Sequence, residues 1–176
     1  NKEIIKLLIT PKVLLTTNNN RETPLHYALC NRSDKEIIKL LITPEILLMK
    51  NKDGNTPLHH ALCNKNGNKE IIKLLIIPKV LSMKNNYGET PLHYALLNKN
   101  DNKEIIKLLI TPEILITTDN KDGNTPLYYA LFNKSDKEIV ELLITPEVLL
   151  MKNNYEETPL HFECRSSISS VEIIKL

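Results

Sequence analysis

The sequence lacks several residue types that mark particular classes of protein. Among its 176 residues there is no Trp, and only four Gly and three Cys occur. Four scattered glycines cannot form the glycine-rich loop that holds a phosphate group, and a small, odd number of cysteines does not build a disulfide framework. No apolar run approaches the roughly 20 residues that a membrane-spanning helix needs. These absences predict a protein with no phosphate-binding loop and no membrane insertion.

An excess of charge of either sign is also missing. Lys and Arg total 23 and Asp and Glu total 21, which leaves a net charge of +2. A nearly neutral protein has no long-range attraction to nucleic acid. Many of the lysines alternate with glutamates, as they do on a solvated helix face. We therefore expect no nucleic-acid partner.

The dominant feature of the sequence is an internal repeat. The tetrapeptide T-P-L-H, or T-P-L-Y in one case, recurs at steps of 33, 34, 35 and 33 residues. It begins at Thr23, Thr56, Thr90, Thr125 and Thr158. A second block, K-E-I-I-K-L-L-I or a variant of it, begins at Lys2, Lys35, Lys69, Lys103, Lys137 and Val171. Two blocks that share one period over the whole chain predict a solenoid of stacked repeats.

Each repeat predicts two short helices. Thr is a favourable N-cap and Pro is tolerated at the first helical position, so Thr23 and Pro24 begin the first helix. Its apolar stripe consists of Leu25, Ala28 and Leu29. A capping residue begins each second helix, namely Asp34, Asn68, Asn102, Asp136 and Ser170 in turn. The second helix of the first complete repeat is expected to bury Ile37, Leu40 and Leu41. Because neither helix can bury its stripe alone, the repeats must stack.

The period of 33 residues and the motif T-P-L-H-x-A at the first helix resemble the ankyrin repeat family. The resemblance covers essentially the whole chain. It implies an all-α fold, an ankyrin-repeat solenoid of stacked antiparallel helix pairs with hairpin-like fingers. It also implies that partner proteins bind the concave face through first-helix residues and finger tips, and that the repeats themselves catalyse nothing.

The repeat boundaries predict a single array over residues 1–176. A partial repeat spans 1–17, repeats begin near 18, 51, 85 and 120, and a truncated repeat spans 153–176, with a second helix cut short at 171–176. The first block is as apolar as its internal counterparts at Ile4, Ile5, Leu7 and Leu8. Terminal repeats usually carry polar outer faces, so we expect this chain to be part of a longer array.

A Thr-Pro-Glu segment at residues 43–45 replaces the Gly turn with which the family ends its second helix. Pro cannot adopt the left-handed conformation of that Gly, because its φ is fixed near −65°. Thr, Pro and Glu instead have the order of an N-cap followed by a first helical turn. We predict an extra turn of helix that buries Ile46 and Leu47.

Two other positions depart from the family pattern. The finger glycine is replaced by Arg21 in the first complete repeat and by Glu156 in the last, which predicts less tightly turned fingers. The small Ala of the first helix becomes Glu163 in the last repeat. Because an unpaired buried carboxylate is costly, either this helix is shifted or Glu163 faces solvent.

Four histidines belong to the repeated motif, namely His26, His59, His93 and His161. Residues separated by one repeat, roughly 10 Å, cannot converge on one metal ion. His59 and His60 are adjacent on a helix and point about 100° apart. The family resemblance implies structural hydrogen bonds near the fingers for the motif histidines. We predict no metal and no other cofactor.

The cysteines show no catalytic pattern. Cys30 and Cys63 occupy equivalent places in neighbouring repeats, which lie farther apart than the reach of a disulfide. No cysteine has the fixed His partner and orienting group of a nucleophile. We therefore predict no enzyme activity and no small-molecule substrate, and reduced thiols favour an intracellular, cytoplasmic location.

A line of side chains on the first helices forms the predicted binding face. Each repeat contributes one member at a place where the family contacts partners: Cys30, Cys63, Leu97, Phe132 and Arg165. A partner helix or extended segment could lay apolar side chains along this line. Tyr27, Tyr94 and Tyr129 lie three residues before members of the line, and packing between repeats is the alternative role for them.

The finger tips provide a second group of predicted contacts, which comprises Lys52, Asp53, Tyr87, Asp122 and Tyr155. The tips alternate between N-K-D-G-N and N-N-Y-G-E or its variant, and exposed Tyr is a favoured interface residue. Duplication of repeat pairs explains this alternation without any function. An Asn begins each finger and is expected to bond to the backbone in an Asx turn: Asn18, Asn51, Asn85, Asn120 and Asn153.

Together these features predict a scaffold that binds a partner protein on the concave face and finger tips. The alternative is a targeting or regulatory arm of a larger protein, such as an enzyme, a channel or a host-directed effector, whose active part lies outside these residues. A mechanical spacer is a third possibility, which predicts no specific partner.

Overall fold

Each complete repeat folds into three helices. The computed structural model describes residues 2–31, 33–63, 68–98 and 102–172, with side chains up to residue 165, and contains no strand within them. The first helices are α3 (Pro24–Cys30), α6 (Pro57–Leu62), α9 (Pro91–Leu97), α12 (Pro126–Phe132) and α15 (Pro159–Glu172). The second helices are α1 (Lys2–Leu8), α4 (Lys35–Leu41), α7 (Lys69–Leu75), α10 (Lys103–Leu109) and α13 (Lys137–Leu143). The third are α2 (Pro11–Leu14), α5 (Pro44–Leu47), α8 (Pro78–Leu81), α11 (Pro112–Leu115) and α14 (Pro146–Leu150).

A Thr–His pair holds the start of the first helix. In α3 the backbone N–H of His26 donates to the Thr23 hydroxyl, and the backbone N–H of Thr23 donates to His26 Nδ1 at 3.2 Å. The same reciprocal arrangement begins α6 and α9. It satisfies backbone donors that the end of a helix would otherwise leave without partners.

The Thr-Pro-Glu segment forms an extra helical turn, which confirms the prediction. The Thr43 hydroxyl accepts the backbone N–H of Ile46 at 3.4 Å, and Pro44 takes the first position of α5. Ile46 and Leu47 are both buried. The same hydroxyl cap begins three other third helices, at Thr10, Thr111 and Thr145. The chain therefore changes direction with a new helix start rather than with a left-handed residue.

Along the array the second helices bury two of the three predicted positions, those of Ile37 and Leu41, together with the position of Ile38. In α4 the buried residues are Ile38 and Leu41, and Ile37 packs partly against the core. The prediction of Leu40 is wrong, and its counterparts Leu74 and Leu108 are exposed. The run I-I-K-L-L-I allows two apolar stripes of the same helical spacing, one residue out of phase. Only the packing of the neighbouring helices selects between them.

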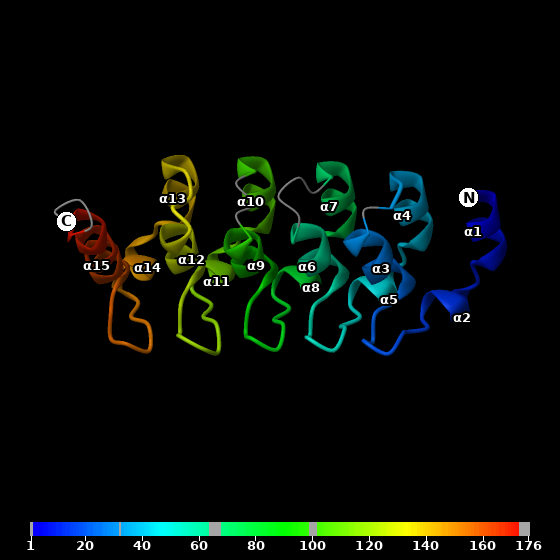
Figure 1. The fold of residues 1–176 in the computed structure, drawn as a ribbon, viewed down its shortest axis with the longest axis horizontal. Coiled ribbons are helices and arrows are strands. Elements are labelled where there is room, and N and C mark those ends of the chain that lie inside the picture. Colours follow the sequence, from blue (N-terminus) through cyan, green and yellow to red (C-terminus); the bar gives the residue numbers. More distant parts are fainter. Residues whose placement is uncertain (1, 32, 64–67, 99–101, 173–176) are drawn as a thin grey trace.

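The repeats stack side by side into an elongated array (Figure 1). The helices α4, α7, α10 and α13 stand in one row, the first helices lie alongside them, and the finger loops project from the opposite edge. Successive first helices pack against one another along the array. Ion pairs join successive second helices at Lys35–Glu70, Lys69–Glu104 and Lys103–Glu138. We call the exposed side of the first helices and the adjoining fingers the concave face, as in the predicted architecture.

Backbone hydrogen bonds join neighbouring fingers. The N–H groups of Asn86, Asn120 and Asn154 each donate to a carbonyl of the preceding finger, at 2.8–2.9 Å. The finger glycines Gly54, Gly88 and Gly123 have φ between 69° and 79°. A Cβ atom at Gly88 would lie 2.5 Å from the backbone nitrogen of Asn120. Glycine is therefore required where the next finger places an Asn against the turn.

The prediction of looser fingers at Arg21 and Glu156 is wrong. Both residues adopt left-handed conformations, with φ of 57° and 59°. Their N–H groups close the turn at 2.9 and 3.0 Å, as the N–H of Gly54 does at 3.0 Å. The finger beside Arg21 carries Lys52 where the later fingers carry Asn, and no described finger follows Glu156. A side chain therefore fits, and only the modest cost of one left-handed residue remains.

The last repeat differs from the others. Helix α15 continues unbroken through Ser170, so the prediction of a separate second helix beginning there is wrong, and residues 173–176 of that prediction lie outside the described residues. In α3 and α9 an Asn amide, from Asn31 and Asn98, donates back to the helix at 2.8 Å and ends it, whereas the last repeat has Ser166 at this position. Glu163 is exposed, which confirms the solvent-facing alternative.

Candidate protein-binding face

The concave face contains four junctions, each between the first helices of successive repeats. Three repeat positions contribute to a junction: the residue before the T-P-L motif, the residue seven after its Thr, and, in the next repeat, the residue four after the Thr. In chain order the junctions hold Glu22, Cys30 and His60; Asn55, Cys63 and Tyr94; Glu89, Leu97 and Tyr129; and Asn124, Phe132 and Phe162. Because the backbone repeats, differences in chemistry between junctions arise largely from these three positions.

The third and fourth junctions form one hollow of about 350 Å³, which we call the aromatic hollow. Its apolar walls are Leu97, Tyr129, Phe132 and Phe162. Leu97 is 39% exposed and Phe132 is 68% exposed, although both are large apolar side chains. Exposed apolar groups gathered in a concavity are typical of binding surfaces.

Polar side chains from the last fingers and α15 form the edge of the aromatic hollow. The Tyr155 hydroxyl donates to Asp122 Oδ1 at 3.1 Å, which ties two successive fingers together. The Arg165 guanidinium lies 3.1 Å from Glu157 Oε1 and 5.4 Å from the centre of the Phe162 ring. These contacts hold the edge in a defined arrangement before any partner arrives.

The aromatic hollow gathers half of the predicted contact residues. Leu97, Phe132, Arg165, Asp122 and Tyr155 all line it. The other predicted residues lie elsewhere on the same face: Cys30 and Cys63 in the first two junctions, Lys52 and Asp53 together on one finger, and Tyr87 on the next finger. All five of these are exposed, and partner contact by any of the ten residues stays a prediction.

Two carboxylates surround the hydroxyl of Tyr129 at the floor of the hollow. The hydroxyl lies 3.0 Å from Asp119 Oδ2 and 3.4 Å from Glu89 Oε1. Burial, followed by the negative charges of Asp119 and Glu89, raises the pKa of Tyr129 well above its ordinary value. The amide of Asn85 donates to the other oxygen of Glu89 at 2.8 Å. Tyr129 is therefore a neutral hydrogen-bond donor fixed in place.

Packing between repeats accounts for two of the three tyrosines that precede the predicted line. The ring of Tyr94 stands edge-on to His59 at 5.5 Å, and the ring of Tyr129 stands edge-on to His93 at 5.4 Å. Tyr27 is instead 60% exposed. The alternative of inter-repeat packing therefore holds for Tyr94 and Tyr129 and fails for Tyr27.

The motif histidines are structural, as expected. The Nε2 atoms of His26, His59 and His93 lie 3.1–3.3 Å from backbone carbonyl oxygens of the following repeat. Burial lowers the pKa of each of these three imidazoles to about 4. His161 pairs with the Thr158 hydroxyl at 2.7 Å. His26, His59 and His93 are therefore neutral and connect successive repeats.

The fingers begin with Asx turns, with one correction. Oδ1 of Asn18, Asn51, Asn85 and Asn153 accepts backbone N–H groups two and four residues on. In the fourth finger this role belongs to Asp119, whose carboxylate accepts the N–H groups of residues 121–124. The prediction of Asn120 is wrong, because that finger is one residue longer and Asn120 instead donates to the preceding finger.

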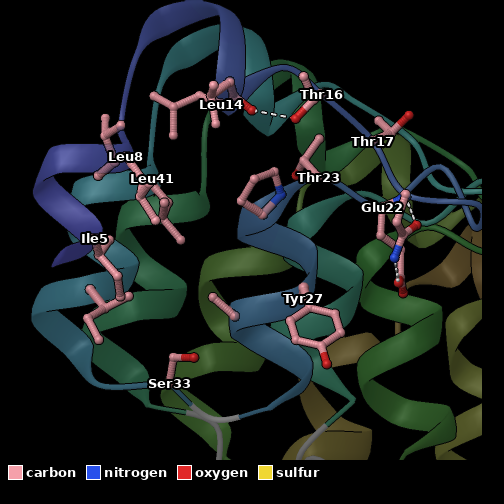
Figure 2. A pocket seen from close by; sticks show the side chains of 16 residues that line it. Ile5, Leu8, Leu14, Thr16, Thr17, Glu22, Thr23, Tyr27, Ser33 and Leu41 are labelled. Carbon is pink, nitrogen blue, oxygen red and sulfur yellow. Dashed lines mark hydrogen bonds between the residues drawn. The ribbon is translucent and has the colours of Figure 1, made fainter. Parts of the chain in front are cut away.

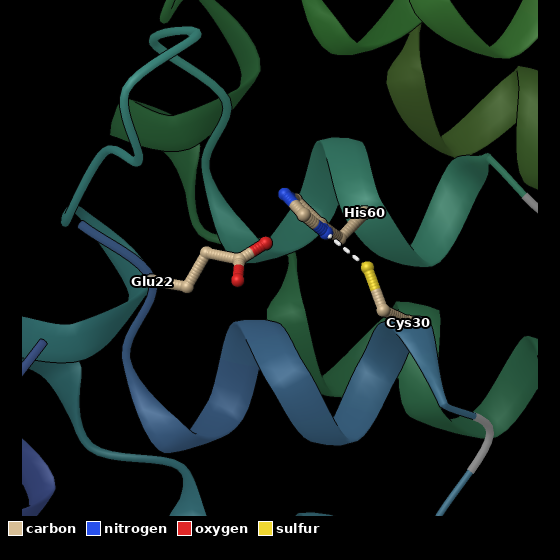
Figure 3. Close-up of side chains that lie close together, drawn as sticks. All are labelled: Glu22, Cys30 and His60. Atoms are coloured by element: carbon tan, nitrogen blue, oxygen red, sulfur yellow. Dashed lines mark hydrogen bonds between the residues drawn. The ribbon is translucent and has the colours of Figure 1, made fainter. Parts of the chain in front are cut away.

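The first junction brings together three side chains that sequence reasoning did not connect: Glu22, Cys30 and His60 (Figure 3). The Cys30 sulfur lies 2.7 Å from His60 Nδ1. All three cysteines are free. The signal was present in the repeat register, because position 60 is the only one of the five equivalent positions that carries His rather than Tyr or Phe.

A large cavity lies at the N-terminal end, between α1, α2 and α3 (Figure 2). It measures about 630 Å³, and Ile5 and Leu8 of α1 face Tyr27 of α3 across it. In later repeats the first helix of the preceding repeat packs beside the counterparts of Pro24, which are buried: Pro57, Pro91 and Pro126. The cavity therefore occupies the position that, in the later repeats, is filled by the first helix of the preceding repeat.

The stacked helices define a helical-repeat solenoid. None of the described helices is long and apolar enough to cross a membrane. A family profile described as ankyrin repeats, in three copies, matches residues 1–81, 43–118, 62–154 and 99–176. The chain belongs to the ankyrin repeat family, whose repeats are in general protein–protein interaction modules. A comparison with curated proteins found no match.

Proposed function

We propose that this array binds a partner protein through its concave face, with the aromatic hollow as the principal contact. The observation that carries this proposal is the exposure of Leu97 and Phe132 inside a concavity whose other walls are aromatic. Neither side chain contributes to the buried core. Removing them from water on binding would therefore stabilise a complex at little cost to the array.

The chemistry of the aromatic hollow favours a particular kind of partner segment. Its walls suit an apolar side chain, and the carboxylates of Glu89 and Asp122 line it. Two cations line it as well: Arg165 is engaged by Glu157, and Lys121, which is largely exposed, lies 3.9 Å from Asp122 Oδ2. A partner that places a Lys or Arg beside an apolar side chain would complement both features. A helix or an extended segment could present such a pair of residues.

A pull-down experiment with matched variants tests this proposal. The purified array would be exposed to an extract of the source cells as wild type, as Leu97→Glu/Phe132→Glu, and as Leu74→Glu/Leu108→Glu. Leu74 and Leu108 are 45% and 38% exposed and lie on α7 and α10, outside the concave face. The control therefore places the same charges on comparably exposed leucines.

We expect recovery of the partner to fall at least about 100-fold for the concave-face variant, because two hot-spot contacts are each worth about 2 kcal/mol or more. Recovery should be unchanged for the second-helix variant. Equal recovery by wild type and the concave-face variant would contradict the proposed contact site.

A further inference from the structure

The first junction differs from the other three in the kind of atoms that it brings together. Glu22 lies just before α3, Cys30 is the last residue of α3, and His60 lies on α6. One carboxylate oxygen, the sulfur and one imidazole nitrogen all lie within 4.8 Å of one another. Figure 3 shows the three side chains pointing toward one another from two successive repeats.

We propose that Glu22, Cys30 and His60 form a Zn²⁺ site with three protein ligands and a fourth position open to the concave face. Thiolate, imidazole and carboxylate are the ligand types of zinc, whereas Mg²⁺ and Ca²⁺ prefer oxygen ligands alone. A three-ligand zinc site leaves one position for water or for a ligand from another molecule. The Cys30 thiol releases its proton to solvent when the metal binds.

The distances need only a small adjustment to hold the metal. Zn–S of about 2.3 Å and Zn–N of about 2.0 Å at a tetrahedral angle separate the two ligand atoms by about 3.5 Å. The sulfur of Cys30 and Nδ1 of His60 are now 2.7 Å apart. Cys30 is exposed at the end of its helix, so rotation of its side chain can provide the difference. Glu22 is already oriented by the Asn18 amide, which donates to Oε2 at 2.9 Å.

The fold does not require this set of side chains. The second junction has Asn55, Cys63 and Tyr94 at the same three positions, and the other two have no Cys and no His. All four junctions nevertheless join first helices that pack against one another. The combination of carboxylate, thiol and imidazole is therefore a property of one junction rather than of the repeat, and Cys63 is a matched control for Cys30.

The neighbour of His60 gives a sharper test. Asn51 Oδ1 accepts the N–H groups of Asp53 and Asn55, so its amide nitrogen faces His60 Nε2, at 3.1 Å. A metal on Nδ1 moves the imidazole proton to Nε2, where it needs an acceptor rather than a donor. A carboxylate at position 51 would supply one. Asp119 already begins the fourth finger at the corresponding position, so the fold tolerates Asn51→Asp.

The experiment is a Zn²⁺ titration of the 176-residue chain in competition with a chromophoric chelator, repeated with Co²⁺ to detect the sulfur-to-cobalt absorption band. We expect one Zn²⁺ per chain in the wild type. Cys30→Ser and His60→Tyr should each weaken binding at least about 30-fold and abolish the cobalt band, and Cys63→Ser should change neither. Asn51→Asp should tighten binding by about 10-fold, because the carboxylate accepts the proton on the other nitrogen of the metal-bound imidazole.

Folding of each variant is checked by its thermal unfolding in the absence of metal. His60→Tyr places at position 60 the residue that occupies positions 94 and 129, so this variant retains a side chain known to fit a junction. The proposal is overturned if the wild type binds Zn²⁺ no more tightly than Cys30→Ser, if Cys63→Ser is as defective as Cys30→Ser, or if Asn51→Asp weakens binding. None of these outcomes bears on the aromatic hollow.

Discussion

The first junction and the aromatic hollow lie toward opposite ends of the same face and are built from corresponding repeat positions. At the first junction a thiol, an imidazole and a carboxylate meet within 4.8 Å. In the hollow the equivalent positions carry Leu97, Tyr129, Phe132 and Phe162 together with Glu89 and Asn124. The helices around them have the same lengths to within a residue, apart from α15, and α3, α9 and α12 each have a Thr N-cap followed by Pro.

This comparison separates what builds the array from what gives each region its chemistry. The first junction and the aromatic hollow share the features that build the array. Both have buried Leu, Ile and Ala side chains, a Thr–His cap, and an imidazole that bonds to the next repeat. They make the repeats stack without specifying a partner. Of the three side chains at each junction, the one seven residues after the Thr is exposed in every repeat and contributes little to the core, so this position is free to vary: Cys30, Cys63, Leu97 and Phe132.

The largest expected effect is on the shared scaffold. Leu92 is fully buried in α9, whereas Leu97 on the same helix is exposed. Leu92→Ala should lower the free energy of unfolding by about 2–5 kcal/mol, because it leaves a cavity in the core. Leu97→Ala should lower it by less than about 1 kcal/mol. Urea unfolding of the two variants measures both values, and equal losses would show that Leu97 belongs to the scaffold after all.

The next effect concerns the difference between the two regions. Phe132→Ala should weaken partner binding about 30-fold, because it removes an exposed aromatic contact worth about 2 kcal/mol. Cys63→Ala, at the equivalent position outside the hollow, should weaken it less than about threefold. Isothermal titration with the captured partner measures both affinities. A larger loss at Cys63 than at Phe132 would move the principal contact to the other end of the face.

The third prediction concerns pH and the histidines that connect repeats. Burial lowers the pKa of His93 to about 4, whereas an unfolded chain takes up the proton near pH 6.5. The folded state therefore binds fewer protons between pH 6.5 and about 4. Stability contributed by neutral His93 is complete above pH 6.5 and is lost as the pH falls through that window.

The variant His93→Tyr isolates this contribution. Tyr128 occupies the corresponding position one repeat later and donates to the Met151 and Glu157 carbonyls, so a Tyr fits there. Between pH 7 and pH 4.5 the wild type should lose about 2 kcal/mol more of its free energy of unfolding than the variant does. Urea unfolding at the two pH values measures the difference. Identical pH dependence in both proteins would contradict the lowered pKa.

The smallest effect concerns the fingers. Arg21→Gly should raise the free energy of unfolding by no more than about 1 kcal/mol, because relief of the left-handed strain is partly offset by the greater freedom of Gly in the unfolded chain. Gly88→Arg, the reverse change beside Asn120, should be clearly destabilising because a Cβ atom there meets the next finger. Thermal unfolding of the pair distinguishes the two fingers, and changes of equal size and opposite sign in the two variants would show that the neighbouring finger does not matter.

Features that depend on adjacent residues could be predicted from the sequence. Thr43 and Pro44 predict a helix start without reference to any other repeat, and α5 begins there. Features that depend on a neighbouring repeat could not. Whether position 21 tolerates a side chain is decided by Lys52 on the next finger. Asp119 rather than Asn120 begins the fourth finger because of a one-residue insertion, and the repeat step of 35 does not show where in the repeat that insertion lies.

The candidate site was predictable in part for the same reason. Leu97 and Phe132 were placed on the exposed side of their helices by helical spacing alone, and both are exposed. The meeting of Glu22, Cys30 and His60 depends on the offset between two stacked repeats, which only the packed helices define. The depth of the hollow likewise depends on Phe162 and on how α15 closes against α12.

Site-specific photo-crosslinking tests the central claim most directly. A benzophenone side chain is placed at position 132 in one protein and at position 108 in another, and each is irradiated in the presence of the partner. Phe132 lies on the concave face, whereas Leu108 lies on a second helix. The account predicts an adduct with the partner from position 132 and none from position 108. An adduct from position 108 alone would contradict it.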